Sequence, residues 1–417
     1  MGQKKICLVT SEHISYNPRL VKEADALTAA GYAVRVVALN REPEKWKLDQ
    51  ELMRQRSWRL ESLPASRKAG NRLLWLRAAL RQKLFAQLKL LQAAPGGLDR
   101  AYSRHAPELA ALAGRESADL FLAHNLPALP AAATSARKWN AKLGFDAEDF
   151  HRGEFLETAE TAEVRRCTAL VEEKYIPRCD YLTAASDGIG REYAKLLRIT
   201  PPLTILNVFP LSERAGQTPQ EELNRERQGD GLSLYWYSQV IGPDRGLEDA
   251  LRATALLKPR AQLHVRGGCA NGYADHFLGE ARRLGILDRV HLLVPVPPPQ
   301  LVERAAQHDV GLALEVPRTE NRKVALTNKI FTYLLAGIAV AASDVPSQVE
   351  IMNQVSNAGF AFASGEADCL ANGLTKWLDD PEELARAKRC SRANGESRFC
   401  WEIESKKLIH AVGQVLN

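Results

Sequence analysis

The sequence lacks the features that mark a membrane-spanning, secreted or zinc-binding protein. No apolar run reaches the ~18 residues that a membrane-spanning helix needs, and the run at 6–9 is too short for a signal peptide. The seven cysteines form no CxxC pair and stand beside no cluster of histidines, which argues against a zinc site or a disulfide framework. We therefore expect free thiols in a reducing compartment, the cytoplasm.

A strong excess of charge is also absent. The 417 residues include 56 basic and 50 acidic ones, and the net charge of +6 does not indicate a nucleic-acid-binding protein. Residues 10–16, which follow the first apolar run, contain no glycine, and this excludes the G-x-G-x-x-G loop of an NAD-dependent dehydrogenase. No Asp-x-Asp metal motif occurs, because Asp146 and Asp149 have the wrong spacing. We expect no nucleic-acid partner, no metal and no cofactor.

What is present is an alternation of short apolar runs with stretches of helical periodicity. The runs that predict strands lie at 5–10, 32–39, 119–123, 142–146, 181–185, 203–206, 232–237, 262–266, 290–294, 310–314 and 338–342. The stretches that predict helices lie at 18–31, 247–257, 274–285, 298–307 and 328–336. This alternation predicts an α/β protein in which helices cover parallel sheets.

A polar stretch at 212–231 separates two α/β series of similar length. Such a stretch is typical of a domain boundary. We therefore expect two doubly wound, Rossmann-like domains, the first over 1–211 and the second beginning at 212. Ligands of such domains bind at the carboxyl ends of the strands, so the expected binding cleft lies between the two halves.

The stretch 67–91 is unusual because it carries many basic residues and no acid. Seven Lys and Arg residues lie between Glu61 and Asp99, interleaved with leucines, a tryptophan and a phenylalanine. On a helical projection, one face collects five leucines: Leu73, Leu76, Leu80, Leu84 and Leu91. One interpretation is a peripheral contact with the inner face of the cytoplasmic membrane. The other is an amphipathic helix packed on the first sheet, with solvated arginines.

Arg245 is the first candidate for binding an anion. It stands between a predicted strand and a predicted helix, and Gly242 and Gly246 flank it. Glycines allow a close approach of the backbone, and a guanidinium pairs well with phosphate oxygens. The alternative is an ordinary surface arginine in a turn.

The start of the predicted helix at 328–336 is the second candidate. Thr327 or Asn328 would cap it, and Lys329 adds a positive charge next to the free amide groups of its first turn. Such a helix start binds anions. The alternative is a buried structural helix.

These segments resemble, in their order, the GT-B glycosyltransferases, specifically the retaining enzymes of family 4 that assemble bacterial polysaccharides and glycolipids. Arg245-Gly246 stands where that family has a Lys-Gly that contacts the donor diphosphate. The resemblance extends over 328–337 and 341–344 in the second half, and over 17–31, 124–130 and 145–149 in the first. Trp401-Glu402 resembles the family's last helices, which implies a second domain at 212–395 and a C-terminal helix, 396–417, that crosses back to the first domain.

The resemblance implies a sugar transfer from a nucleotide-diphosphate donor to a hydroxyl of a glycan or lipid-linked acceptor, with retention and without a metal. Arg245 and Lys329 would stabilise the leaving diphosphate, and His124 would lie near the sugar. The other expected donor-binding residues are Gly242, Gly246, Thr327, Asn328, Thr332 and Glu320. The expected acceptor-binding residues are Asn17, Arg19, Glu148 and Asp149.

The sequence departs from the family at one pair of positions. The family often carries two glutamates eight residues apart, and Val324 and Thr332 stand there in this chain. Glu315 and Glu320 are nearby but do not have the matching spacing. Two other functions therefore stay open, a catalytically inactive GT-B scaffold and a sugar-nucleotide epimerase.

Overall fold

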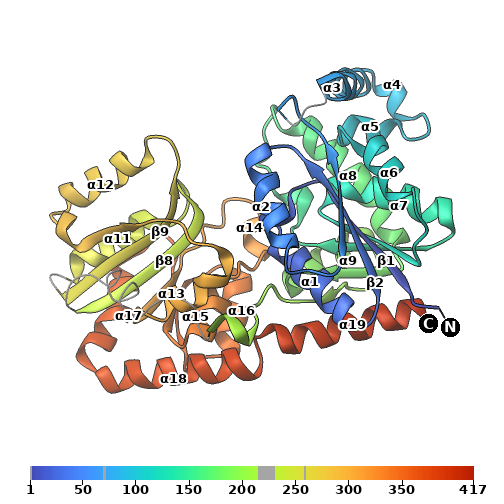
Figure 1. The fold of residues 1–417 in the computed structure, drawn as a ribbon. Helices are drawn as coiled ribbons and strands as arrows, with labels where there is room; N and C mark the ends of the chain where they lie inside the picture. Colours follow the sequence, from blue (N-terminus) through green and yellow to red (C-terminus); the bar gives the residue numbers. More distant parts are fainter. Residues whose placement is uncertain (1, 69–71, 215–230, 258–259) are drawn as a thin grey trace. The chain divides into compact units, whose positions relative to one another are not determined.

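The computed structural model describes residues 2–68, 72–214, 231–257 and 260–417. The chain divides into two compact units (Figure 1). The first unit is Met1–Ile205 with Ser405–Asn417, and the second is Leu206–Glu404. The division therefore falls a few residues before the expected boundary at 211, and the return to the first unit begins at 405 rather than at 396. Most of the polar stretch 212–231 lies outside the described residues.

The first unit contains a seven-stranded sheet in which each described pairing is parallel. Its strands are β1 (Lys5–Thr10), β2 (Ala33–Asn40), β3 (Arg59–Pro64), β4 (Leu120–His124), β5 (Lys142–Ala147), β6 (Tyr181–Ala184) and β7 (Leu203–Thr204). They lie in the order β3-β2-β1-β4-β5-β6-β7. The chain reverses its direction of winding between β1 and β4, and this switch point is where doubly wound sheets bind ligands.

The helices of the first unit lie between consecutive strands along the chain. They are α1 (Pro18–Ala29), α2 (Pro43–Met53), α3 (Arg72–Gln87), α4 (Lys89–Gln92), α5 (Gly97–Tyr102), α6 (Ala106–Ala113), α7 (Leu129–Trp139), α8 (Ala162–Tyr175) and α9 (Asp187–Leu197). Helix α1 shows why the local sequence folds in this way. The Asn17 side chain accepts a hydrogen bond from the Leu20 amide, and Pro18 fits the first turn because it needs no amide partner there.

The second unit contains a six-stranded sheet with the same parallel winding. Its strands are β8 (Leu232–Ile241), β9 (Ala261–Cys269), β10 (Val290–Leu293), β11 (Val310–Ala313), β12 (Ala339–Ser343) and β13 (Gly359–Phe362). They lie in the order β10-β9-β8-β11-β12-β13, so the switch point falls between β8 and β11. Strands such as β12 are buried along their whole length, which is typical of parallel sheets covered on both faces.

The helices of the second unit complete the α/β layers. They are α11 (Leu247–Leu256), α12 (Tyr273–Arg283), α13 (Leu301–Ala305), α14 (Glu320–Val324), α15 (Lys329–Ala336), α16 (Pro346–Gln354), α17 (Ala367–Asp379), α18 (Pro381–Ser397) and α19 (Trp401–Leu416). Helix α19 begins in the second unit, and its residues from Ser405 onward belong to the first.

The prediction of an α/β fold with two parallel sheets is confirmed. The sequence analysis did not predict the edge strands β3 and β13, and β7 is shorter than the predicted run at 203–206. The stretch 67–91 was expected to form one amphipathic helix. Instead α3 ends at Gln87 and the short α4 follows, so Leu91 is not on the same helix as the other leucines. None of the helices that the structure describes is long and apolar enough to cross a membrane.

Candidate functional site: a cationic cluster and a buried ion network

Two clusters of charged side chains lie at the carboxyl ends of the sheets, one in each unit. In the second unit, the loop with Arg245 follows β8, and Glu315 comes just after β11. Gly246 has a φ of 71°, and a Cβ there would lie 2.8 Å from the Cβ of Leu314. Only glycine fits without strain. The loop therefore packs closely against the residue that precedes Glu315.

Glu315 is the carboxylate that holds the cationic cluster together. Its Oε1 lies 2.7 Å from Lys329 Nζ, and its Oε2 lies 3.2 Å from Arg322 Nη1. Burial alone would raise the pKa of Glu315, but the Lys329 ammonium together with the Arg322 and Arg245 guanidinium groups outweighs burial, and the pKa is lowered. The carboxylate is therefore ionised at neutral pH. Its single negative charge is therefore shared between two cations, Lys329 and Arg322.

Arg245 adds a third cation to this cluster. Burial is the main cause that lowers the pKa of Arg245. The neighbouring Arg322 guanidinium lowers it further, while the Glu315 carboxylate opposes the shift. Among the described residues, none forms a hydrogen bond or an ion pair with Arg245. The cluster of Arg245, Arg322 and Lys329 therefore carries more positive charge than Glu315 neutralises, and an anion would balance it.

The start of α15 adds backbone donors to the cationic cluster. No side chain in the described part of the chain caps this helix, so the amide groups of its first turn are left without a side-chain acceptor there. The Asn328 Oδ1 accepts a hydrogen bond from the Tyr237 hydroxyl at 3.1 Å instead. The Thr327 Oγ is buried and has no hydrogen-bond partner among the described residues. Free amides, a helix dipole and a lysine together form a site suited to phosphate oxygens.

Some of the expected donor-binding residues lie at the cationic cluster and others lie away from it. Gly246, Thr327, Asn328 and Lys329 lie at the cationic cluster or at the adjoining start of α15. Thr332 is fully buried, and its hydroxyl lies 2.7 Å from the Tyr237 hydroxyl rather than facing open space. Their contact with a donor stays a prediction.

Glu320 and Gly242 are not drawn into this arrangement. The Glu320 side chain is 67% exposed and pairs with Lys323, three residues further along α14. A Cβ on Gly242 would meet the Ala270 Cβ at 3.6 Å and the Val240 Cγ1 at 3.9 Å, which are ordinary contact distances. Arg322 was not predicted from the sequence. The available signal was its position in a short helix capped by Thr319, just after the strand that precedes Glu315.

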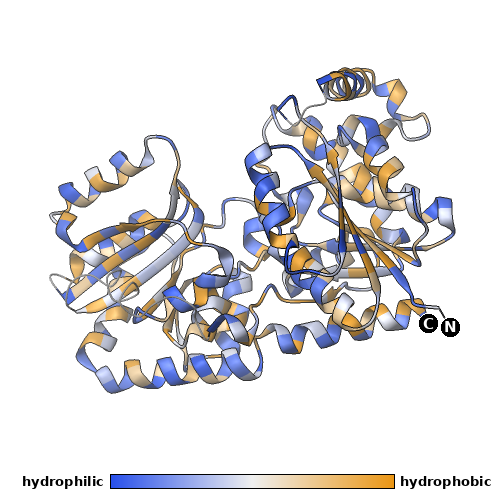
Figure 2. Cartoon of the chain, in the orientation of Figure 1, coloured by the Kyte–Doolittle hydropathy of each residue, from blue (hydrophilic) through white to orange (hydrophobic). Residues whose placement is uncertain are grey.

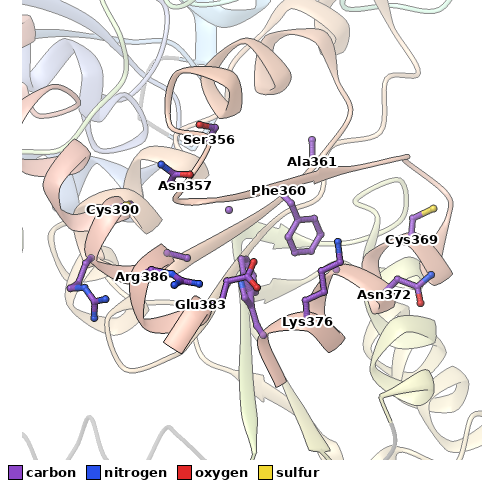
Figure 3. A pocket seen from close by; sticks show the side chains of 15 residues that line it. Ser356, Asn357, Phe360, Ala361, Cys369, Asn372, Lys376, Glu383, Arg386 and Cys390 are labelled. Atoms are coloured by element: carbon purple, nitrogen blue, oxygen red, sulfur yellow. The ribbon is translucent and has the colours of Figure 1, made fainter. Parts of the chain in front are cut away.

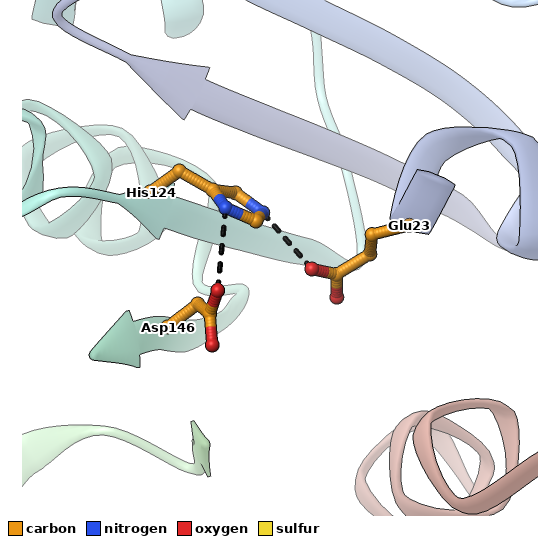
Figure 4. Close-up of side chains that lie close together, drawn as sticks. All are labelled: Glu23, His124 and Asp146. Carbon is orange, nitrogen blue, oxygen red and sulfur yellow. Dashed lines mark ion pairs between the residues drawn. The ribbon is translucent and has the colours of Figure 1, made fainter. Parts of the chain in front are cut away.

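The second cluster lies in the first unit, where β1, β4 and β5 end side by side. Thr10 pairs in register with His124, and His124 pairs with Asp146. Helix α1 begins beside these strand ends and contributes Arg19 and Glu23, which are one helical turn apart. Figure 4 shows the His124 ring between the carboxylates of Glu23 and Asp146.

His124 is fully buried and both of its ring nitrogens face carboxylates. The Nε2 lies 3.0 Å from Glu23 Oε2, and the Nδ1 lies 3.1 Å from Glu148 Oε1 and 3.4 Å from Asp146 Oδ2. Burial alone would lower the pKa of His124, but the Glu23 carboxylate and the hydrogen bond to Glu148 raise it to about 10. The imidazole is therefore charged at neutral pH. Its contact with a sugar stays a prediction, and this geometry favours a positioning role.

Arg19 donates three hydrogen bonds within the buried network. Its Nε and Nη2 donate to the two oxygens of Asp146 at 2.6 and 2.7 Å, and its Nη1 donates to the Ile205 carbonyl at 2.6 Å. Burial alone would raise the pKa of Asp146, but the Arg19 guanidinium lowers it to about 2. The pKa of Glu23 is raised by burial, and His124 opposes that shift.

The expected acceptor-binding residues differ in their access to solvent. Asn17 and Arg19 are buried, and the Asn17 amide donates to Glu148 Oε1 at 2.7 Å. The Glu148 side chain is 24% exposed, so it connects the buried network to the surface. The Asp149 backbone carbonyl accepts a hydrogen bond from Tyr193. The sequence analysis assigned no role to Glu23, although its spacing from Arg19 on α1 was a usable signal.

Glu23, His124 and Asp146 are also close enough together to be considered as metal ligands. Asp146, however, already accepts hydrogen bonds from Arg19 and from the Thr183 hydroxyl at 2.6 Å. A cation there would lie beside the Arg19 guanidinium and would compete with the charged imidazole. The donor set therefore fits a buried ion network better than a metal site.

A cavity of about 830 Å³ lies in the second unit, between β13, α17 and α18. The residues that line it include Phe360 and Trp377 and the cations Lys376, Arg386 and Arg389. Figure 3 shows Phe360, Lys376 and Arg386 around it. None of the residues of the cationic cluster lines this cavity.

The chain resembles solved structures over its whole length. HepE from Anabaena, in complex with UDP and glucose, is 16% identical with a TM-score of 0.72, and the match covers 99% of this chain and 100% of that one. Sucrose-phosphate synthase from Thermosynechococcus elongatus is 15% identical with a TM-score of 0.70, and the match covers 99% of each chain. The chain has the GT-B fold.

The same fold also occurs in an enzyme of another class. UDP-GlcNAc 2-epimerase from Neisseria meningitidis, bound to UDP-GlcNAc, is 12% identical with a TM-score of 0.62, and the match covers 98% of this chain and 100% of that one. No protein-family model matches the sequence, and no curated protein matches it. At identities this low, the structural matches establish the GT-B fold, and the reaction has to be argued from the residues.

Proposed function

We propose that this GT-B chain is a glycosyltransferase that moves a sugar from a nucleotide-diphosphate donor to a hydroxyl of a glycan or lipid-linked acceptor. The observation that carries the proposal is the cationic cluster, in which Arg245, Arg322 and Lys329 face a single carboxylate beside the uncapped start of α15. Three of the similar structures were solved with UDP, UDP-glucose and UDP-GlcNAc, which supports the same class of ligand here.

The chemistry of the transfer requires positive charge at the leaving group. Negative charge builds on the diphosphate as the glycosidic bond breaks, and fixed donors that stabilise this charge lower the barrier. Arg245 has no partner among the described residues, so its guanidinium is available to the diphosphate. Lys329 is held by Glu315, so its main effect is the field that it adds at the start of α15. No step of this mechanism needs a divalent metal.

The stereochemical course and the biological setting follow from the resemblance to family 4. We propose that the acceptor hydroxyl attacks from the face of the leaving group, and that the departing phosphate takes its proton, so that the anomeric configuration is retained. We place the reaction in the synthesis of bacterial surface polysaccharides.

In the first unit we propose a division of labour around the buried network. Glu148 reaches the surface and is our candidate for contact with the acceptor hydroxyl. His124 and Asn17 lie behind it and position its carboxylate through hydrogen bonds. Arg19 acts on it by charge, while the hydrogen bonds of its guanidinium hold Asp146. Asp149 stays a candidate for acceptor contact because it follows Glu148 in the same loop.

The proposal is tested by a thermal-shift screen of the full chain against UDP, GDP, CDP, dTDP and ADP and their sugars, with EDTA present. A ligand at 100 times its Kd adds ~2.7 kcal/mol to the stability of the unit that binds it, which corresponds to roughly 5–10 °C. The shift should shrink to roughly half or less in Arg245→Gln, and it should persist in Arg283→Gln, which removes an exposed arginine of the same unit. No shift with any nucleotide would support the inactive scaffold.

The similarity to an epimerase makes a second function worth testing. An epimerase converts the nucleotide sugar without an acceptor, whereas a transferase needs one. The nucleotide sugar identified in the screen is incubated alone, and the products are analysed by NMR. A new sugar epimer that retains its nucleotide would assign the chain to the epimerases, and an unchanged donor supports a transferase.

A further inference from the structure

Helix α3 exposes leucines that a soluble protein normally buries. The exposed fractions are 59% for Leu73, 46% for Leu76, 61% for Leu80 and 49% for Leu84. At 100° per residue, these four positions fall within one third of the helix circumference. One of the two interpretations of 67–91 was an amphipathic helix whose leucines pack on the first sheet. That interpretation is wrong for these four leucines, because they are exposed. Figure 2 shows apolar and polar residues together on α3.

The opposite face of α3 already serves to pack the helix onto the protein. Ala78 on that face is fully buried, and Leu74, Trp75 and Phe85 are partly buried. Helices α5 and α4 are in contact with α3. Arg81 also points to this side, where it forms an ion pair with Glu108 of α6 at 2.7 Å. The helix is therefore anchored by one face, and the leucines of the other are not required for that packing.

The exposed leucines share their face with three cations. Arg72, Arg77 and Lys83 are exposed, fall on the same half of the helix and have no hydrogen-bond or ion-pair partner among the described residues. No acid occurs in 62–98, so nothing local neutralises them. We define these four leucines and three cations as the α3 face.

An indole on the packed side of α3 lies under two guanidinium groups. Arg67 lies over the Trp75 ring at 4.2 Å, and Arg104 lies over it at 5.4 Å. Trp75 is partly buried, and both arginines add positive charge beside the helix. The basic character of this region therefore extends beyond the α3 face.

The α3 face could be covered by another protein or by a lipid bilayer, and its mixture of leucines and cations favours the bilayer. A protein interface would bury Arg72, Arg77 and Lys83 together with the leucines, and buried cations without partners are costly. A bilayer surface avoids this conflict, because leucines enter the acyl boundary while long basic side chains reach back to anionic headgroups. We propose that the α3 face docks the chain on an anionic bilayer. This inference is independent of the donor site.

The test is cosedimentation of the full chain with vesicles of phosphatidylcholine alone and of phosphatidylcholine with 30% phosphatidylglycerol. Binding is expected only with the anionic vesicles, and 0.5 M salt should weaken it because charges at the surface are screened. The triple variant Arg72→Gln, Arg77→Gln, Lys83→Gln should lower the partition coefficient on the order of a hundredfold. The double variant Leu80→Ser, Leu84→Ser should lower it about tenfold or more.

Matched controls separate the α3 face from general charge and hydrophobicity. The triple variant Lys376→Gln, Arg386→Gln, Arg389→Gln removes the same charge from the cavity in Figure 3 and should bind like the wild type. The double variant Leu196→Ser, Leu256→Ser changes two other exposed leucines and should also bind like the wild type. The melting temperature of each variant confirms that it is folded.

Three results would overturn the proposal. The first is no binding to anionic vesicles, and the second is equal binding by the wild type and both α3 variants. The third is a dimer that the wild type forms in light scattering and that the Leu80→Ser, Leu84→Ser variant loses, because a second copy would then cover the α3 face.

Discussion

The interaction between Arg19 and Asp146 allows a sharp test of the buried network. We consider Arg19→Met, which keeps most of the side-chain volume and removes the charge. Three hydrogen bonds are lost, two to Asp146 and one to the Ile205 carbonyl, and Asp146 is fully buried. Breaking a buried pair from one side costs about 3–5 kcal/mol, because the remaining charge has no partner. For a unit of about 200 residues, this lowers Tm by roughly 6–20 °C.

The pH dependence of this cost distinguishes a lost charge pair from lost packing. In the wild type the pKa of Asp146 is about 2, below its ordinary value of 3.8, so its stabilisation is present above pH 3.8 and is lost as the pH falls through 2. In Arg19→Met the guanidinium no longer lowers the pKa, and burial raises it. The difference in Tm between the variant and the wild type should therefore shrink between pH 7 and pH 5.

The assay is thermal unfolding followed by circular dichroism, with Lys195→Met, an exposed substitution on α9, as the control. The double variant Arg19→Met, Asp146→Asn should recover part of the loss, because a neutral amide is cheaper to bury than a carboxylate. A Tm for Arg19→Met within 2 °C of the wild type would refute the reasoning. So would a double variant that is no more stable than the single one.

Three further predictions follow from other residues. Gly246→Ala should weaken nucleotide binding at least tenfold in calorimetry because of its positive φ and the 2.8 Å contact, whereas Gly242→Ala should leave the affinity unchanged. The pKa of His124 is raised to about 10 from an ordinary 6.5, so the stability that it contributes is complete below pH 6.5 and is lost as the pH rises through 10. The free energy of unfolding measured in urea should therefore fall by up to ~1.4 kcal/mol per pH unit above pH 7. His124→Gln should remove that slope. Thr332→Glu, which restores the family's acid, should lower Tm rather than improve binding, because the residue is fully buried beside Tyr237.

Most of the fold was predictable because parallel strands are buried on both faces and appear as apolar runs. Strand β1 shows this directly, since each residue after Lys5 is buried. Strand β3 was missed because it lies at the sheet edge and its residues are only partly buried or exposed. Edge strands make fewer contacts, so their composition is less constrained and the signal is weaker.

The candidate site was predictable only where one segment carried the whole signal. Arg245 beside Gly246, and Lys329 at a helix start, are local patterns with a physical meaning. Arg322 reaches Glu315 from α14, seven residues further along the chain. The cap at Thr319 marks the start of that helix, but it does not indicate which side chain the arginine contacts. The same limit applies to His124, whose partners on α1 and β5 enclose it and could not be identified from the segment around it.

The affinity of the full chain for nucleotide diphosphates tests the central claim most directly. Isothermal titration calorimetry of the wild type and Arg245→Gln, without metal, compares the Kd of the nucleotide selected in the screen. A charge-assisted contact to a diphosphate is worth about 1.5–3 kcal/mol, so the account predicts a Kd that is roughly 10- to 150-fold weaker in the variant. Equal affinities in the two proteins would place the anion elsewhere and would contradict the assignment of the cationic cluster as the donor site.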